Sequence, residues 1–309
     1  HCCSTLLHGP NGEWFKSMME KELASGEGFL KKPLNLIDRK SVWERIQKAG
    51  LTEAEVGYLW MDDSLGLILD KLDAIGIADN TIVVFVSDHG SERKGSLIKT
   101  RGTEIPCLIR WPKVIKPGSV SQGLLQNTDF VPTWFELAGA KIPKGYHIDG
   151  KSLVPMFKDP AVSIRKYIYG EQGAARAIKT EAFEYISIRY TDEQVAAAMS
   201  KRADRAYKTL LGLSSGISRA RYLHPDIFSA DQLYDLSKDP TSQKNVAEDS
   251  RYAGQLKKMK AILSRTVKEL GPRPYGDFAP GEGTSDAEAS QKVLDKLAAY
   301  HAKEGKKKK

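Results

Sequence analysis

Residues 81–90 read TIVVFVSDHG, and this stretch decides the fold. The six residues Thr81–Val86 are continuously apolar and rich in β-branched side chains, which predicts a central strand buried on both faces. A helical pattern over Thr52–Ile75 precedes the strand. A helix followed by such a strand favours an α/β fold with a largely parallel sheet. Asp88 and His89 then follow the strand at the edge of the sheet where ligands bind.

The helix before the strand carries signals at both ends. Thr52 with Glu55 three residues later is the pattern of a capping box, and apolar residues then recur at near-helical spacing. Gly76 and the polar residues after it are predicted to end the helix. The adjacent acids Asp62 and Asp63 fall inside the helix and point in different directions, so we interpret them as structural or surface residues.

The chain changes character after about residue 160. Alternating apolar and polar residues there predict antiparallel strands at Lys166–Gly170, Ala177–Thr180, Tyr185–Tyr190 and Gln232–Leu236. We therefore predict an incomplete α/β domain over residues 1–172. A smaller α+β subdomain over residues 173–309 holds the antiparallel sheet, a helix at Tyr252–Leu270 and a Lys-rich tail. The Gly- and Pro-rich segment after Gly271 is expected to pack loosely or not at all.

The composition narrows the class of protein. The chain has 309 residues, of which 41% are hydrophobic and 28% charged, as in soluble globular proteins. Its longest apolar runs are far shorter than a membrane span. The terminal run Lys303–Lys309 supplies much of the net charge of +8, and we expect a solvated, disordered tail. No regular interleaving of basic and aromatic residues indicates binding to nucleic acid.

Asp88 and His89 are the candidate chemical groups at the strand end. A carboxylate and an imidazole side by side can both face one metal ion, because carboxylates suit hard cations and imidazole accepts borderline ones. The alternative is an aspartate that caps the loop beside a surface histidine. The pair by itself leaves both interpretations open.

Five segments resemble, in order and in spacing, the type I (formylglycine-dependent) sulfatases of the alkaline phosphatase superfamily. They are NTIVVFVSDHG at 80–90, GTEIPCLIRWPKVIKPG at 102–118, NTDFVPTWFELAG at 127–139, DGKSL at 149–153, and QLYDLSKDP at 232–240 followed by Asn245 and Val246. The resemblance covers roughly residues 1–265. It implies an alkaline-phosphatase-like sandwich with a largely parallel central sheet, and a metal-dependent hydrolase of sulfuric esters.

The resemblance also implies roles for individual residues. Asp88 and His89 match calcium ligands of the family. His8, in the stretch LHGP, matches the histidine of a P-H-x-P turn that donates a proton or contacts the sulfate ester. Lys94, in the stretch KGSL, matches the sulfate-binding lysine, and Lys99 is its rival for that role.

Two family features have no match in this chain. The family makes its formylglycine nucleophile from Cys or Ser in a C/S-x-P-x-R motif, and an N-terminal Asp-Asp pair supplies two further metal ligands. Neither occurs here in that context. Because both precede the P-H-x-P turn in the family, we expect them upstream of His1. The chain also has Glu104 where the family usually has Arg or His.

The resemblance implies hydrolysis of a sulfate monoester with Ca²⁺ or another divalent cation. The expected substrate is a sulfated small molecule or a sulfated carbohydrate, and the expected location is periplasmic or extracellular. The alternatives are a phosphonate or phosphate ester hydrolase of the same superfamily and a non-catalytic polyanion-binding fragment. We expect no nucleic acid partner and no membrane span, and we expect this chain to be inactive without the upstream nucleophile.

Overall fold

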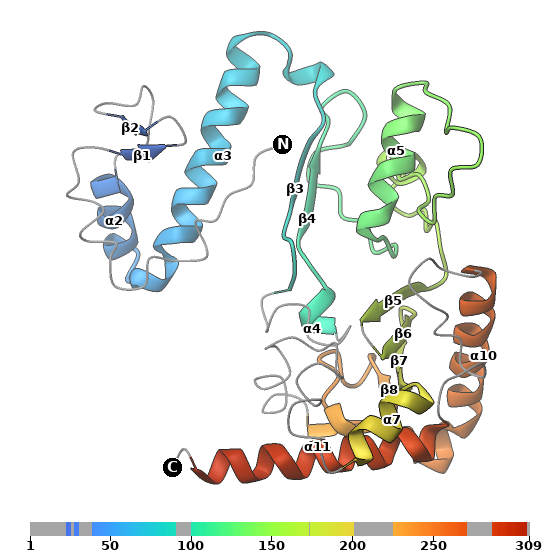
Figure 1. Cartoon of the computed structure of the whole chain (residues 1–309). Helices are drawn as coiled ribbons and strands as arrows, with labels where there is room; N and C mark the ends of the chain where they lie inside the picture. Colours follow the sequence, from blue (N-terminus) through green and yellow to red (C-terminus); the bar gives the residue numbers. More distant parts are fainter. Residues whose placement is uncertain are drawn as a thin grey trace. The chain divides into compact units, whose positions relative to one another are not determined.

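The computed structural model describes seven ranges of the chain, and they form two compact units (Figure 1). The described ranges are 23–25, 28–30, 39–90, 100–172, 174–200, 225–270 and 286–307. One unit comprises residues 1–83 and 111–113, and the other comprises residues 84–110 and 114–309. No helix within the described ranges combines the length and the apolarity that crossing a bilayer requires.

The first unit is built on two helices. Helix α2 spans Arg39–Lys48 and packs against α3, Val56–Ala74, around a core of buried residues, Val42, Ile46 and Val56. The short turns η2 and η3 span Glu53–Glu55 and Ala78–Asn80, and the short strands β1 and β2 span Leu23–Ser25 and Gly28–Leu30. β1 and β2 pair antiparallel.

The signals at the ends of α3 are confirmed. Thr52 and Glu55 form a capping box, which lies on the η2 turn that leads into the helix. Gly76 follows the helix with a φ of 72°, the left-handed conformation that glycine adopts without steric cost. The Arg45 guanidinium binds the carboxylate of Asp63, so Asp63 joins α2 to α3 as a structural residue. Asp62 beside it is exposed.

The predicted strand over 81–86 is present as β3, Val83–Val86, of which all but the first residue belongs to the second unit. β3 is hydrogen-bonded to β4, Cys107–Arg110, after the short helix α4, Thr100–Thr103. The prediction that β3 is buried on both faces is wrong for the described residues. Its first three residues are half-buried and Val86 is 40% exposed, so the described residues leave both faces of the strand partly uncovered.

Short helical elements follow β4. They are the turn η5 at Asn127–Asp129, helix α5 at Phe130–Leu137 and helix α6 at Val154–Lys158. Gly139 stands after α5 with a φ of 62°, as expected for a glycine that ends a helix.

The C-terminal half of the second unit is an antiparallel sheet, as predicted. Its order is β5-β6-β7-β8. The strands are β5 at Ile168–Gln172, β6 at Ala175–Lys179, β7 at Phe183–Ile188 and β8 at Asp231–Asp235. The turn η6, Pro225–Phe228, leads into β8, and the turn η7, Ser250–Tyr252, follows it.

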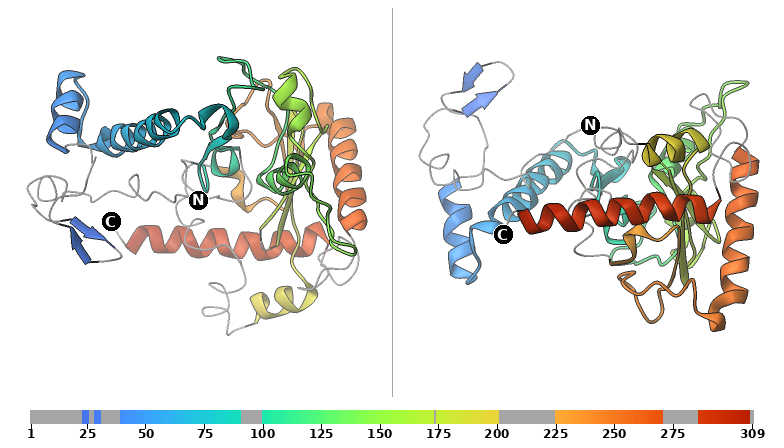
Figure 2. Two further views of the ribbon diagram at one scale, coloured as in Figure 1. Left: turned by 90° about the horizontal axis from the view of Figure 1, so that it is seen from above. Right: turned by 60° about the horizontal axis from the view of Figure 1, so that its bottom comes forward.

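Alternate residues of these strands pack against different helices. Figure 2 shows the ribbons of these helices around the sheet. Ile178, Tyr185 and Leu233 pack against helix α10, Ala253–Leu270. Their chain neighbours pack on the other side with helix α7, Asp192–Met199, and helix α11, Ala287–Lys307; they include Ala177, Ile186 and Tyr234. The period of two is what a sheet covered on both faces requires. Each large side chain buried in this way contributes about 1.5–3 kcal/mol.

The prediction for the end of the chain is wrong for residues 287–307, whereas residues 271–285 lie outside the described residues. Residues 287–307 form α11, whose Val293, Leu294 and Leu297 are buried in the core of the sheet. The buried face of this helix has only three large apolar residues. The Gly- and Pro-rich sequence just before it therefore favoured the prediction of a loosely packed segment. The lysine run is also helical as far as Lys307, rather than a disordered tail.

The pairing of β5 with β6 does not fit a domain boundary after residue 172. The boundary expected after residue 172 falls between β5 and β6, and these strands are hydrogen-bonded neighbours from Ile168 with Lys179 to Gln172 with Ala175. We propose that the C-terminal subdomain begins at Ile168, because a boundary at 172 would separate one strand from its own sheet.

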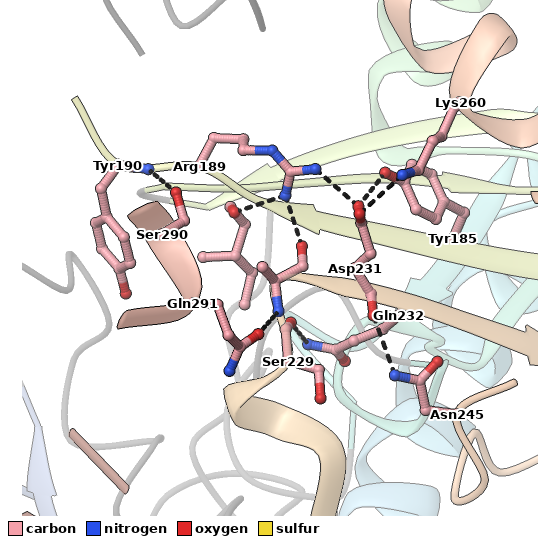
Figure 3. Close-up of polar contacts among 12 residues, drawn as sticks. Tyr185, Arg189, Tyr190, Ser229, Asp231, Gln232, Asn245, Lys260, Ser290 and Gln291 are labelled. Carbon is pink, nitrogen blue, oxygen red and sulfur yellow. Dashed lines mark hydrogen bonds and ion pairs between the residues drawn. The ribbon is translucent and has the colours of Figure 1, made fainter. Parts of the chain in front are cut away.

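A polar network joins the sheet to α10 (Figure 3). The Asp231 carboxylate accepts hydrogen bonds from the Tyr185 hydroxyl at 2.6 Å, from Arg189 Nη2 at 2.8 Å and from Lys260 Nζ at 2.8 Å. Arg189 also donates to the carbonyl oxygen of Ala230 at 2.8 Å. Burial alone would raise the pKa of Asp231, but these donors outweigh it and the pKa is lowered.

The lowered pKa of Asp231 predicts acid sensitivity. Its stabilising contribution is present above the unfolded-state pKa of about 3.9 and is lost as the pH falls through the lower folded-state pKa. Urea unfolding at pH 6 and at pH 3 should show a smaller loss of stability on acidification for Asp231→Asn than for the unaltered chain. The exposed control Asp79→Asn should retain the full loss. Identical acid dependence in the two variants would contradict the assignment.

Candidate functional site

The candidate site lies in the turn that follows β3. Ser87 Oγ donates a hydrogen bond to the His89 carbonyl oxygen at 2.8 Å, and His89 N donates to Asp88 Oδ1 at 3.0 Å. These two bonds hold the turn in one conformation. The Asp88 side chain is 86% exposed and the His89 side chain is 35% exposed, so both can reach a ligand from solvent.

The contacts of His89 determine which ring nitrogen can bind a metal. Nδ1 lies 2.8 Å from the Gly90 carbonyl oxygen. A carbonyl oxygen can only accept a hydrogen bond, so Nδ1 carries a proton and Nε2 is the ring nitrogen left to bind a metal. Metal-binding histidines commonly donate their second ring N–H to a backbone carbonyl in this way.

The two side chains fit one divalent cation. His89 Nε2 and Asp88 Oδ2 are 3.6 Å apart. Two donor atoms at this separation can both contact an ion at the usual bond lengths of about 2.0–2.6 Å. The described ranges contain no group of three or more His, Cys, Asp or Glu side chains that could hold a metal. The two side chains by themselves offer fewer donor atoms than a divalent cation binds.

A backbone hydrogen bond joins two glycines on either side of the segment that follows the pair. Gly90 N donates to the Gly102 carbonyl oxygen at 2.9 Å, and both glycines are buried. The segment between them carries Lys94 and Lys99, so both ends of that segment are joined beside Asp88 and His89. Lys94 and Lys99 themselves lie outside the described residues, and so does His8. Their roles stay predictions.

Glu104, where the chain departs from the family pattern, has a partner in the C-terminal sheet. Its carboxylate accepts a hydrogen bond from Lys179 Nζ at 3.0 Å. The Glu104 side chain is mostly exposed, and an exposed pair of this kind contributes about 0–1 kcal/mol. The pair links the segment before β4 to β6.

A buried carboxylate organises the segment that the motif NTDFVPT predicted. Asp129 is fully buried. Its Oδ2 accepts a hydrogen bond from Gln126 N at 2.7 Å, and its Oδ1 accepts one from Lys151 N at 2.8 Å. Oδ1 also binds the guanidinium of Arg165, which is itself almost completely buried. Asp129 is therefore a structural residue that joins three stretches of chain.

The DGKSL motif packs directly on this segment. A Cβ at Gly150 would lie 2.0 Å from the Thr128 carbonyl oxygen, so the contact leaves room only for glycine. Leu153 N donates a hydrogen bond to Thr133 Oγ1 at 2.9 Å. The two motifs therefore contact each other directly. Gly150 packs on the backbone of Thr128, and Leu153 N binds the hydroxyl of Thr133.

Gln126 and Arg165 extend this arrangement to the sheet. Gln126 Nε2 donates to the Tyr169 carbonyl oxygen in β5 at 2.6 Å, and Arg165 Nη1 donates to Gln126 Oε1 at 2.6 Å. Sequence analysis missed both residues. The one signal in the sequence was an arginine, Arg165, just before a predicted strand. An arginine in that position needs a carboxylate partner if the fold buries it.

The QLYDLSKDP motif forms a hydrogen-bonded turn after β8. Asp235 accepts from Ser237 Oγ at 2.5 Å and from Lys238 Nζ at 2.7 Å, and these bonds lower the pKa of Asp235 to about 2. Asn245 Oδ1 accepts from Leu233 N at 2.9 Å, which extends the edge of β8. The motif therefore maintains the fold of the subdomain.

Comparison with known proteins identifies relatives of this chain. Residues 57–140 match the family model of the sulfatases. An ulvan-active sulfatase of Formosa agariphila is 31% identical over 210 residues, which cover 65% of this chain and 38% of that protein. An N-acetylglucosamine-6-O-sulfatase of Bacteroides thetaiotaomicron is 28% identical over 231 residues, which cover 72% of this chain and 36% of that protein.

Comparison with solved structures indicates the fold. A Bacteroides thetaiotaomicron structure described for the metabolism of multiple glycosaminoglycans superposes with a TM-score of 0.52 at 25% identity. The match covers 72% of this chain and 46% of that one. The fold is therefore the predicted α/β fold of alkaline-phosphatase-like type.

These comparisons support the sulfatase family for this chain. The chain spans less than two fifths of the length of these two curated relatives, at 38% and 36%.

Proposed function

We propose that this chain carries the Asp88–His89 part of the metal site of a sulfatase that hydrolyses sulfate monoesters. The observation that carries the proposal is the pair of donor atoms His89 Nε2 and Asp88 Oδ2, which lie 3.6 Å apart at the end of a family-matched strand. The match to the sulfatase family favours sulfate over phosphate or phosphonate as the group transferred.

The residues of the chain have separate tasks in this proposal. Asp88 and His89 hold a divalent cation, which when bound polarises the sulfate group. Lys94 or Lys99 offsets negative charge on the sulfate oxygens, because both lie on the segment closed by the hydrogen bond from Gly90 to Gly102. His8 donates a proton to the departing alcohol. The attacking group is a formylglycine, which these residues do not supply.

The proposed substrate is a sulfated carbohydrate. One relative is named for activity on ulvan and another for the 6-O-sulfate of N-acetylglucosamine. The positive net charge of +8 fits an anionic substrate. We propose Ca²⁺ as the resident cation and a periplasmic or extracellular location, both on the family resemblance.

The metal ligands provide a direct test in the natural gene product that carries this chain. Asp88→Ala and His89→Ala should each lower hydrolysis of p-nitrophenyl sulfate by about 100-fold or more and weaken Ca²⁺ binding in calorimetry. The controls Asp79→Ala and His147→Ala remove an exposed aspartate and an exposed histidine, and should change neither.

Two outcomes would reject the proposal. One is hydrolysis of p-nitrophenyl phosphate far faster than of the sulfate, which would move the enzyme to the phosphate branch of the superfamily. The other is full Ca²⁺ affinity in both Asp88→Ala and His89→Ala.

A further inference from the structure

We infer that Ser87 is a positioning residue of the proposed metal site, because its hydroxyl holds the backbone that carries His89. The inference rests on the proposed function, in which Asp88 and His89 bind a divalent cation. Ser87 directly precedes the pair in the stretch SDHG, at the end of β3. It does not touch the cation in this proposal, and it acts through the conformation of the turn.

One peptide group, between His89 and Gly90, is held at both of its polar atoms. Ser87 Oγ donates a hydrogen bond to the His89 carbonyl oxygen at 2.8 Å. At the other end of the same group, Gly90 N donates to the Gly102 carbonyl oxygen at 2.9 Å. Gly102 belongs to α4, which lies near the end of β3 in Figure 1. Because a peptide group is planar and rigid, it cannot turn without weakening at least one of these two bonds.

The held peptide group sets the position of the acceptor for the imidazole ring. His89 Nδ1 lies 2.8 Å from the Gly90 carbonyl oxygen. Only the two backbone dihedral angles of Gly90 separate this carbonyl from the held peptide group, so a rotation of that group moves the carbonyl with it. Without this acceptor, the proton is no longer kept on Nδ1, and Nε2 is no longer the ring nitrogen left to bind a metal.

The Asp88 carboxylate depends on the same turn. Its Oδ1 accepts a hydrogen bond from His89 N at 3.0 Å, and its Oδ2 lies 3.6 Å from His89 Nε2. The Asp88 side chain is 86% exposed, so hydrogen bonding within the turn, more than packing, determines where Oδ2 lies. The separation of the two metal-binding atoms is therefore a property of the backbone conformation that Ser87 stabilises.

A second serine makes the same local bond at a place where the proposed function has no metal ligand. Ser163 Oγ donates to the carbonyl oxygen of Arg165 at 2.8 Å, again two residues further along the chain. Such a bond by itself is a common feature of turns. Ser87 differs from Ser163 in the residue that it holds, which is a proposed metal ligand. Ser163 therefore provides the matched control.

The test removes the Ser87 hydroxyl in the natural gene product that carries this chain and measures Ca²⁺ binding by calorimetry. Ser87→Val and Ser87→Thr introduce side chains of nearly the same shape, but only threonine keeps the hydroxyl. Ser87→Val should bind Ca²⁺ at least about tenfold more weakly than the unaltered protein, as is typical when a residue that orients a metal ligand is lost. Ser87→Thr and the control Ser163→Val should both stay within about twofold of the unaltered affinity.

Two measurements separate positioning from a general loss of structure. In the absence of Ca²⁺, Ser87→Val and Ser163→Val should give the same circular dichroism spectrum and the same midpoint of urea unfolding. Hydrolysis of p-nitrophenyl sulfate by Ser87→Val should return to within about threefold of the unaltered rate at high Ca²⁺ concentration, because a weakened site still fills when enough ligand is present. A rate that stays low at saturating Ca²⁺, together with a lower urea midpoint, would assign Ser87 to the fold and overturn the inference.

The pattern of Ca²⁺ affinities distinguishes a failure of this inference from a failure of the proposed function. If Asp88→Ala and His89→Ala lose Ca²⁺ binding while Ser87→Val binds as tightly as Ser163→Val, the inference alone is overturned. An equal loss in Ser87→Thr and Ser87→Val would also overturn it, because the hydroxyl would then not be the cause. Full Ca²⁺ affinity in Asp88→Ala and His89→Ala would overturn the proposed function and the inference together.

Discussion

Replacing Asp129 with alanine is expected to destabilise the second unit by about 3–5 kcal/mol. The change leaves the buried guanidinium of Arg165 without its carboxylate, and breaking a buried ion pair on one side has a cost of this size. It also removes the acceptor for Gln126 N and Lys151 N. Urea unfolding followed by circular dichroism measures the loss.

Two further variants show whether the buried charge is the cause. Asp149→Ala removes an exposed carboxylate close by in the sequence, whose printed partner is the exposed His147, and should cost less than about 1 kcal/mol. The double variant Asp129→Ala/Arg165→Met removes both charges and should be more stable than Asp129→Ala alone. A double variant as unstable as the sum of its two single changes would show that the Asp129–Arg165 pair carries no coupling energy.

Replacing Gly150 with alanine should cost about 3 kcal/mol or more. The new Cβ would lie 2.0 Å from the carbonyl oxygen and 2.6 Å from the carbonyl carbon of Thr128, which are backbone atoms. Backbone cannot rotate away as a flexible side chain can, so the DGKSL segment must shift and its bonds to Asp129 and Thr133 must lengthen. The same unfolding measurement applies.

The matched control is expected to increase the stability of the chain rather than lower it. Gly66 lies within α3, and a Cβ there meets nothing within 4 Å. Gly66→Ala should therefore stabilise the chain by about 0.5–1 kcal/mol, because alanine has the higher helix propensity. If Gly150→Ala were tolerated as well as Gly66→Ala, the close contact with Thr128 would be refuted.

Local patterns predicted the features that depend on neighbouring residues. The capping box of Thr52 and Glu55, the glycine stop at Gly76 and the four strands of the C-terminal sheet all follow from spacing along the chain, and the structure confirms them. Asp88 and His89 could be named as a candidate pair because they directly follow an apolar strand pattern. The order of the five motifs was enough to indicate the sulfatase family, which the comparisons confirm.

Other features were invisible in the sequence because their partners are far apart along the chain. Arg165 reaches Asp129 across 36 residues, and Lys179 reaches Glu104 across 75. The burial of α11 was missed because three apolar residues form a face only when the sheet is present to cover it.

By itself, the sequence determined the type of most major elements, though not of α11, and it indicated the family and the candidate metal pair at residues 88–89. The tertiary structure decided which nitrogen of His89 is free, since that depends on the Gly90 carbonyl 2.8 Å from Nδ1. It also decided that Asp129 and Gly150 maintain the fold. Spacing can specify a helix face or a strand, but burial and hydrogen-bond partners arise only when distant segments meet.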